Sequence, residues 1–407
     1  MAELNENFEF EQDGKTYSLY DLPKGFVIKG DLSLNGRDLT ELPDLSDVIV
    51  EGDFDCYSNL LTSLKGAPQK VGGSFDCQYN QLATLEGAPE EVGKSFGCSN
   101  NQLTTLDGAP QKVGGYFSCG KNQLTSLHGA PEEISGNFSC GKNQLTTLKG
   151  APKKVGGHFD CSDNQLTTLE GAPEEVGKSF GCSNNQLTTL EGAPRKVGRY
   201  FDCQYNQLAT LEGAPEEIGG YFSCSNNQLT TLKGAPQKVG GYFYCDNNQL
   251  TTLNGAPQEV GGDFYCSNNK LTTLKGAPQK VGGYFSCDNN QLTSLEGAPQ
   301  EVGGNFWCDC NQLTSLFKLP QMKEDKEIYC DEALGQEYGF SDVSDSGIKF
   351  GDLLKSPRYQ NEVKIADLRQ LSQLKEKTMQ ENATKIAKTQ AAFEVWLKKN
   401  GKETPEK

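Results

Sequence analysis

The residues best suited to chemistry are fifteen cysteines and two histidines. A nucleophilic triad or a metal site needs several such side chains close together. His128 and His158 stand 30 residues apart at different positions of a repeat, so they support neither kind of site. Cys308, Cys310 and Cys330 could be considered as metal ligands, but two continue a regular inward series and Cys310 stands where asparagine is usual. We expect no bound metal.

Other catalytic signatures are incomplete. The segment DVSDSGIKFGDL at 342–353 begins like a calcium loop, but Leu353 occupies the twelfth position, where a glutamate ligand is required. The chain contains no GxxxxGK[ST] phosphate-binding motif, and its Gly-Gly pairs belong to the repeat. The sequence therefore predicts a protein that is not an enzyme and that needs no cofactor.

The cysteines are spaced with a constant period. They recur every 21 residues from Cys56 to Cys308, and an asparagine follows three residues after each one, from Asn59 to Asn311. A constant period without insertions indicates stacked copies of one supersecondary unit. One cysteine at the same position of each coil favours a reduced, buried ladder. A disulfide scaffold is the alternative, and such scaffolds have irregular spacings in short secreted chains.

The copy at 72–92 shows how one coil is built. Phe75 and Cys77 are two residues apart, so both should point inward from a short strand. Gly72 and Gly73 allow the bend into that strand, and Gly87 with the following proline turns the chain on the opposite side. The rest of the interior should be filled by Leu82, Leu85, Ala88 and Val92.

This pattern resembles a known family. FxCxxNxLxxL matches the leucine-rich repeat consensus LxLxxNxLxxL over roughly residues 31–320, and the wording GAPxxVGGxFxCxxNxLTxL resembles 21-residue repeats encoded by bacteriophages and some bacteria. The resemblance implies an α/β repeat solenoid, a leucine-rich repeat horseshoe with one short parallel strand per coil on its concave side. It also implies that Asn80 and its equivalents form an inner ladder to backbone groups, as the donors and acceptor of an amide allow.

Four segments are predicted. Residues 1–30 form an N-terminal cap, with a β-hairpin around Asp13-Gly14. Residues 31–334 form the solenoid of about 14–15 coils, the last of them degenerate around Cys330 and continued by Leu334. Residues 335–356 form a C-terminal cap or linker, and 357–407 form an α-helical tail.

The tail has signals for a long helix. Ser356-Pro357 suits a helix start and Gly401 a helix stop. Apolar side chains alternate in steps of four and three, which favours homo-oligomerisation through the helix. The alternatives are docking on a partner or on the acidic face, and a helix packed on the last coil as a cap. The residues of this stripe are Met379, Ala383, Ile386, Gln390, Phe393 and Leu397.

Charge limits the classes of partner. The formal net charge is −16, which disfavours nucleic acid and anionic membranes as partners. The acidic N-terminus has no apolar signal segment, and no apolar run approaches about 18 residues. We expect a cytoplasmic protein. The dipeptide after each Ala-Pro alternates in sign, as in Glu174-Glu175, Arg195-Lys196 and Glu216-Glu217, which gives stacked coils opposite-sign neighbours.

The variable positions lie three and one residues before each cysteine and one and two after it. They should face outward from the strands, where aspartates and aromatic residues gather toward the C-terminal half. We predict a partner-binding surface there, since tyrosine and tryptophan supply contact area and aspartate complements a basic protein. The alternative is that aromatic side chains simply cover the sheet. The predicted residues are Tyr200, Asp202, Tyr221, Tyr242, Tyr244, Asp246, Asp263, Tyr265, Tyr284, Asp288, Trp307 and Asp309.

The functional hypothesis is a protein-binding module that captures or inhibits a host protein, in the host cytoplasm if the chain is phage-encoded. A virion or scaffold component is the first alternative. A ubiquitin ligase effector with Cys330 as nucleophile is less favoured, because fewer than 90 residues follow the repeats, which is short for the catalytic domain of that family. A nucleic-acid mimic is suggested only by the negative charge.

Overall fold

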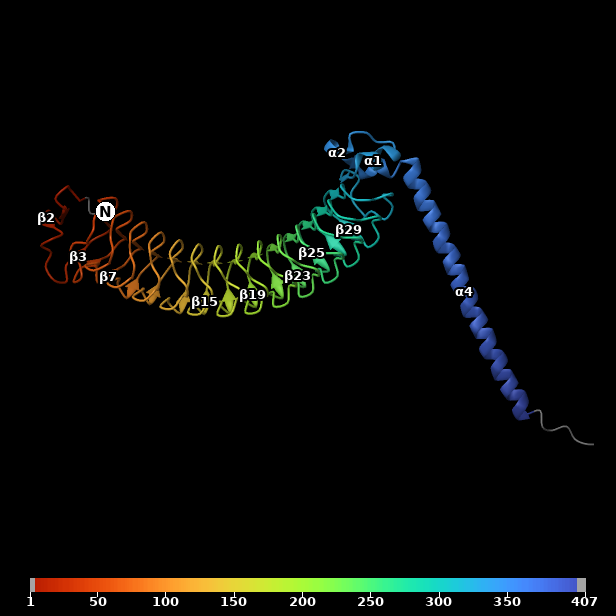
Figure 1. Cartoon of the computed structure of the whole chain (residues 1–407), viewed down its shortest axis with the longest axis horizontal. Helices are drawn as coiled ribbons and strands as arrows, with labels where there is room; N and C mark the ends of the chain where they lie inside the picture. Colours follow the sequence, from red (N-terminus) through yellow and green to blue (C-terminus); the bar gives the residue numbers. More distant parts are fainter. Residues whose placement is uncertain (1–3, 401–407) are drawn as a thin grey trace, which may run out of the picture.

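The chain forms a curved array of stacked coils with a hairpin at one end and a long helix at the other (Figure 1). The computed structural model describes residues 4–400. The coils follow the sequence in order along the array, and strand pairing joins each coil to its neighbours. This confirms the predicted repeat solenoid, including its N-terminal hairpin and its C-terminal helical tail.

One long parallel sheet runs through all the coils. It has sixteen strands, of which only the last, β32 (Ile348–Lys349), is antiparallel to its neighbour. Phenylalanines pair in register from coil to coil, for example Phe243 with Phe264. The parallel strands are β4 (Leu32–Ser33), β6 (Phe54–Asp55), β8 (Phe75–Asp76), β10 (Phe96–Gly97), β12 (Phe117–Ser118), β14 (Phe138–Ser139), β16 (Phe159–Asp160), β18 (Phe180–Gly181), β20 (Phe201–Asp202), β22 (Phe222–Ser223), β24 (Phe243–Tyr244), β26 (Phe264–Tyr265), β28 (Phe285–Ser286), β30 (Phe306–Trp307) and β31 (Glu327–Tyr329).

A second series of parallel strands precedes the Gly-Gly corner of the coils, and the sequence analysis did not predict it. It forms two sheets, of five and nine strands, with a break between β11 and β13. The first sheet comprises β3 (Val27–Ile28), β5 (Ile49–Val50), β7 (Lys70–Val71), β9 (Glu91–Val92) and β11 (Lys112–Val113). The second comprises β13 (Glu133–Ile134), β15 (Lys154–Val155), β17 (Glu175–Val176), β19 (Lys196–Val197), β21 (Glu217–Ile218), β23 (Lys238–Val239), β25 (Glu259–Val260), β27 (Lys280–Val281) and β29 (Glu301–Val302).

The predicted charge alternation lies on these strands. Glu175 pairs in register with Lys196, and Lys196 with Glu217. Lys280 and Glu301 form an exposed ion pair with 3.1 Å between Nζ and Oε2. Each such pair contributes at most about 1 kcal/mol, so the alternation chiefly avoids repulsion between neighbouring coils.

The interior consists of stacked identical residues. The phenylalanines from Phe54 to Phe306 are buried, and successive ring centroids lie 5.0 to 5.7 Å apart. The ladder cysteines are buried and unpaired, as the reduced-ladder interpretation predicted. The Cys203 thiol donates to the carbonyl of Ser223 in the next coil at 3.2 Å. Burial raises the pKa of Cys203 well above its ordinary value, so these thiols stay protonated.

The asparagine ladder connects each coil to its predecessor, as the family resemblance implied. The Asn206 amide nitrogen donates to the carbonyls of Cys182 and Cys203, each at 3.1 Å, and to that of Gln204 at 3.1 Å. Its Oδ1 accepts from the Leu187 amide at 3.0 Å. One buried side chain thereby satisfies backbone groups of two coils that have left the strand ladder.

Glycine is required at both turns of the coil for different reasons. Gly87 has φ of +96°, a left-handed conformation that side chains with a Cβ disfavour. At Gly72 a Cβ would lie 2.3 Å from the carbonyl oxygen of Glu51, so the coils could not approach as closely. Both positions are among the glycines that the sequence analysis assigned to turns.

Each end of the solenoid has a cap. The hairpin joins β1 (Glu9–Gln12) to β2 (Lys15–Ser18) through Asp13-Gly14, both with positive φ. At the other end the last coil is followed by α1 (Glu332–Glu337), α2 (Val343–Ser346), β32 and α3 (Phe350–Leu353). Leu334 is buried in α1 and belongs to the same apolar core as the coils. The four predicted segment boundaries stay predictions.

The tail is one helix, α4 (Pro357–Asn400), which begins at the predicted proline. Ser356 was predicted to cap the start of this helix. Its hydroxyl instead donates to the Tyr338 carbonyl at 3.0 Å. Glu362 accepts from the Tyr338 hydroxyl at 2.7 Å, and the Arg358 guanidinium donates to the Thr314 carbonyl at 2.9 Å, which attaches the first turns of α4 to the cap and the solenoid. The predicted stop at Gly401 lies outside the described residues.

Beyond those turns α4 extends away from the coils (Figure 1). Met379 is 72% exposed and Ile386 59%. The alternative of a helix packed against the last coil therefore holds only for the first turns of α4. Within residues 4–400, no helix combines the length and apolar character needed to cross a lipid bilayer.

Candidate functional site

The outer surface of the long sheet carries the predicted residues. Along β24, Phe243 and Cys245 are fully buried, and the alternation of side chains places Tyr244 between them on the opposite side. Tyr242 is 44% exposed and Tyr284 41%. We call the surface formed by the twelve predicted residues, from Tyr200 to Asp309, the tyrosine face.

The aromatic rings of this face form two groups. In the first, Tyr200 stacks on Tyr221 with centroids 4.6 Å apart, and Tyr244 stacks on Tyr265 at 5.1 Å. Tyr221 meets Tyr244 edge-on at 6.2 Å, and Tyr242 meets Tyr244 at 6.0 Å, which joins the five rings.

The second group consists of Tyr284, Trp307 and Tyr329. Trp307 lies edge-on to Tyr284 at 5.1 Å and stacks on Tyr329 at 5.2 Å. Asp263 stands between the two groups, accepting from the Tyr265 hydroxyl at 3.2 Å and from the Tyr284 amide at 2.7 Å. The rings of the tyrosine face therefore form two groups linked by a carboxylate.

Two members were missed by the sequence analysis. Tyr329 stands one residue before Cys330, so the rule that found Trp307 would also have found it. The ring of His158 lies 5.8 Å from that of Tyr200, two coils away. His158 stands three residues before Cys161, the same coil position as Tyr200, so the same rule would have placed it on this face.

Several aspartates of the tyrosine face also accept hydrogen bonds from residues of the strands and the turns that follow them. Asp202 accepts from the Gln204 amide at 3.1 Å, and Asp246 accepts from the Ser267 amide at 2.9 Å. Asp288 accepts from the Ser267 hydroxyl at 2.5 Å. Burial raises the pKa of Asp202 and of Asp309, in spite of hydrogen bonds that oppose the rise. The acidic side chains are thus held in fixed positions.

Asp246 is the most perturbed of these carboxyls. Burial raises its pKa to about 6, with a smaller contribution from the charge of Asp288. The neighbouring phenols are perturbed in the same direction, since burial and then Asp202 raise the pKa of Tyr221 to about 12. The Tyr221 hydroxyl therefore stays protonated at neutral pH, whereas Asp246 titrates at about pH 6.

The cysteines and histidines do not assemble into a reactive site. Among the described residues no cluster of three histidine, cysteine or acidic side chains could hold a metal ion. Cys308 and Cys330 are buried, whereas Cys310 is exposed. Burial, and then the charge of Asp331, raises the pKa of Cys330 to about 12, which makes it a poor nucleophile.

The calcium-like segment is not a loop. Residues 342–353 contain α2, β32 and α3, and Leu353 is fully buried at the position where a ligand would be required.

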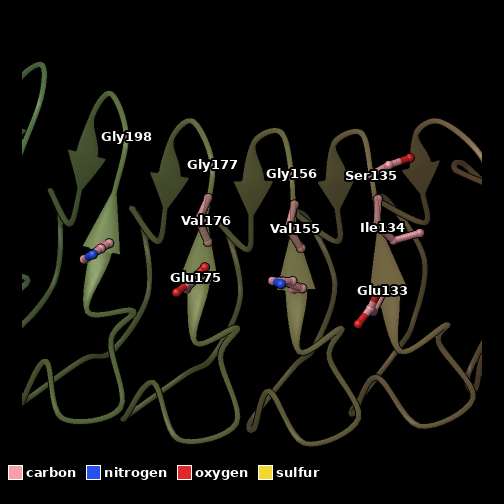
Figure 2. Close-up of a pocket in the computed structure, with 11 residues that line it drawn as sticks. Glu133, Ile134, Ser135, Val155, Gly156, Glu175, Val176, Gly177 and Gly198 are labelled. Atoms are coloured by element: carbon pink, nitrogen blue, oxygen red, sulfur yellow. The ribbon is translucent and has the colours of Figure 1, made fainter.

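A groove on the second series of strands offers less chemistry. It has a volume of about 440 Å³ and runs along β13, β15, β17 and β19. Figure 2 shows Ile134, Val155 and Val176 on successive coils, with Glu133 and Glu175 beside them. Backbone glycines and charges of alternating sign line it, so it has no feature that singles out one ligand.

Comparison with known proteins supports the fold. No family model matches the chain, and no curated protein matches its sequence. Among solved structures, YopM from Yersinia pestis, described as a leucine-rich effector protein, superposes with a TM-score of 0.55 at 23% identity. That match covers 78% of this chain and 86% of the other. The chain has the leucine-rich repeat fold.

A second leucine-rich repeat neighbour agrees. YopM from Yersinia enterocolitica WA-314 superposes with a TM-score of 0.51 at 23% identity, over 74% of this chain and 72% of the other. These two similarities show that the fold is shared. They say nothing about the side chains of the tyrosine face.

The raised pKa of Asp246 predicts how stability depends on pH. An unfolded aspartate has a pKa of about 3.9, so between about pH 4 and pH 6 the native carboxyl holds more protons than the unfolded one. The free energy of unfolding should therefore fall as pH rises through this window. We expect Asp246→Asn to lack this loss, so that its stability relative to wild type increases from about pH 4 to pH 7, measured by chemical denaturation.

The matched control is Asp163→Asn, which removes an exposed carboxyl from another coil and should keep the wild-type pH profile. Parallel profiles for wild type and Asp246→Asn would contradict the assignment.

Proposed function

We propose that the chain is a non-enzymatic protein-binding module whose tyrosine face captures a protein partner. The observation that carries this proposal is a surface of interlocked tyrosine rings, partly exposed and interspersed with fixed carboxylates. Tyrosine and tryptophan dominate the energetics of protein interfaces because they bury large areas at low entropic cost.

The partner is expected to present a basic surface. The chain carries a net charge of −16, and the tyrosine face contributes Asp202, Asp246, Asp263, Asp288 and Asp309. Complementary charge speeds association and selects against acidic partners. Neither nucleic acid nor membrane is part of this proposal, because both are anionic.

The setting that we infer is a host cell. The repeat wording resembles proteins encoded by bacteriophages and some bacteria, and one structural neighbour is described as an effector. We propose a phage-encoded factor that acts in the host cytoplasm by sequestering or inhibiting a host protein. The outer face of the long sheet would be the concave, binding side.

We also propose that α4 joins copies of the chain. Ile365, Met379, Ile386 and Phe393 recur at one position of a heptad and are 41%, 72%, 59% and 58% exposed. A long helix with little tertiary packing is marginal in water, and burial of such a stripe between helices would stabilise it.

The tyrosine face should lose its partner when two rings are removed. Tyr242→Ala with Tyr244→Ala is expected to weaken retention of a host protein by at least about tenfold, because truncation of central aromatic residues has the largest effect on interfaces. Affinity capture from host lysate followed by mass spectrometry measures this. The circular dichroism spectrum and melting temperature verify folding.

The control is Tyr116→Ala with Ser118→Ala, at the same two positions of another coil, and it should retain the partner. A partner that is held equally by both double variants would contradict the proposal.

The helix proposal predicts a molar mass of at least twice that of the chain in light scattering. Ile386→Asp should shift the mass toward the monomer by placing a charge in the apolar stripe, whereas Lys388→Asp should not. A monomeric wild-type chain would refute this role for α4.

A further inference from the structure

The first ring group borders an open pocket. A hollow of about 500 Å³ lies on the outer side of β22 and β24, and the residues that line it include Tyr221, Tyr242, Tyr244 and Asp246. The remaining lining is polar and comes from serine, asparagine and glutamine side chains. The pocket thus combines three aromatic walls with one carboxylate.

The three rings are set at large angles to one another. The planes of Tyr221 and Tyr244 meet at 80°, and those of Tyr242 and Tyr244 at 65°. Rings at such angles present both faces and edges toward a shared space. A π face carries partial negative charge, so a cation placed against these rings is attracted to them.

Two of the three rings that line the pocket are each stacked against another tyrosine outside it. Tyr200 stacks on Tyr221 with planes 1° apart, and Tyr265 stacks on Tyr244 with planes 9° apart. Tyr242, which is 44% exposed, is the third aromatic residue that lines the pocket. The cage is therefore largely formed before any ligand arrives, which lowers the entropic cost of binding.

One carboxylate oxygen of Asp246 can accept a further hydrogen bond. Asp246 Oδ1 accepts from the Ser267 amide at 2.9 Å, whereas Oδ2 has only a long contact of 3.4 Å with the Ser225 hydroxyl. Among the described residues that line the pocket none is lysine or arginine, so no internal cation neutralises Asp246 there.

We propose that this pocket binds a cationic side chain, lysine or arginine, presented by the partner protein. The inference rests on the proposed function and specifies which chemical group the tyrosine face recognises. The rings surround the alkyl chain and the charged head, while Asp246 supplies the opposing charge. A single carboxylate with aromatic neighbours suits an organic cation, and among the described residues no group of three His, Cys, Asp or Glu side chains could hold a metal ion there.

The test uses side-chain analogues and the full chain. Ligand-observed NMR at constant ionic strength compares n-butylammonium and N-ethylguanidinium with neutral N-ethylurea, which is close in shape to the guanidinium. We expect at least one cation to bind at least about fivefold more tightly than N-ethylurea, as a cation–π site requires. Equal binding of the neutral compound would overturn the proposal.

Variants assign the binding to this pocket. Tyr244→Ala and Asp246→Asn should each weaken cation binding several-fold, while Tyr244→Phe, which keeps the π face, should retain it. Tyr116→Ala removes an exposed tyrosine at the same coil position as Tyr242 and should change nothing. Cation binding that persists unchanged in folded Tyr244→Ala would place it elsewhere and overturn the assignment.

The outcome is separable from that of the proposed function. Loss of a captured protein in the Tyr242/Tyr244 double variant, together with no preference for the cations, would keep the binding module and refute the cation pocket. A cation preference that depends on Tyr244, with capture unaffected by the double variant, would keep the pocket and refute the proposed role of the tyrosine face.

Discussion

The inner asparagine of the regular coils, from Asn59 to Asn311, makes the interaction on which the rest of the structure depends. After the strand, the backbone must turn away from the sheet, and its amides and carbonyls would then be buried without partners. The Asn206 side chain bonds carbonyls of its own coil and of the preceding one, and accepts from the Leu187 amide. Removing it would leave several buried groups unpaired, at roughly 1–3 kcal/mol each. This constraint fixes the length and register of the coil.

A coil that is fixed internally leaves its outward positions free to vary. Phe243 and Cys245 are committed to the core, but Tyr244 between them is not. The same register places residues of equal coil position on neighbouring strands, where Tyr244 and Tyr265 pair directly. Aromatic side chains at one position therefore stack into rows, and the register of the strands sets where the rings of the tyrosine face lie.

Much of the fold could be predicted from the sequence, because the residues that are the same in every repeat are the buried and turn-forming ones. The inward Phe75 and Cys77 and the turn at Gly87 follow from period and spacing. The second series of strands could not be predicted in this way, because two-residue strands such as Lys196–Val197 form only when stacking brings successive coils into register. The separation of the rings at Asp263 was missed because it depends on side-chain hydrogen bonds across coils.

The most direct test of a binding role for this surface is site-specific photo-crosslinking in host lysate. A benzoylphenylalanine photo-crosslinker replaces either Tyr242, on the tyrosine face, or Lys238, which is exposed on β23 of the same coil. The account predicts a discrete adduct with one protein from position 242 and none from position 238. An adduct from position 238 alone would place the partner on the other surface and contradict the account.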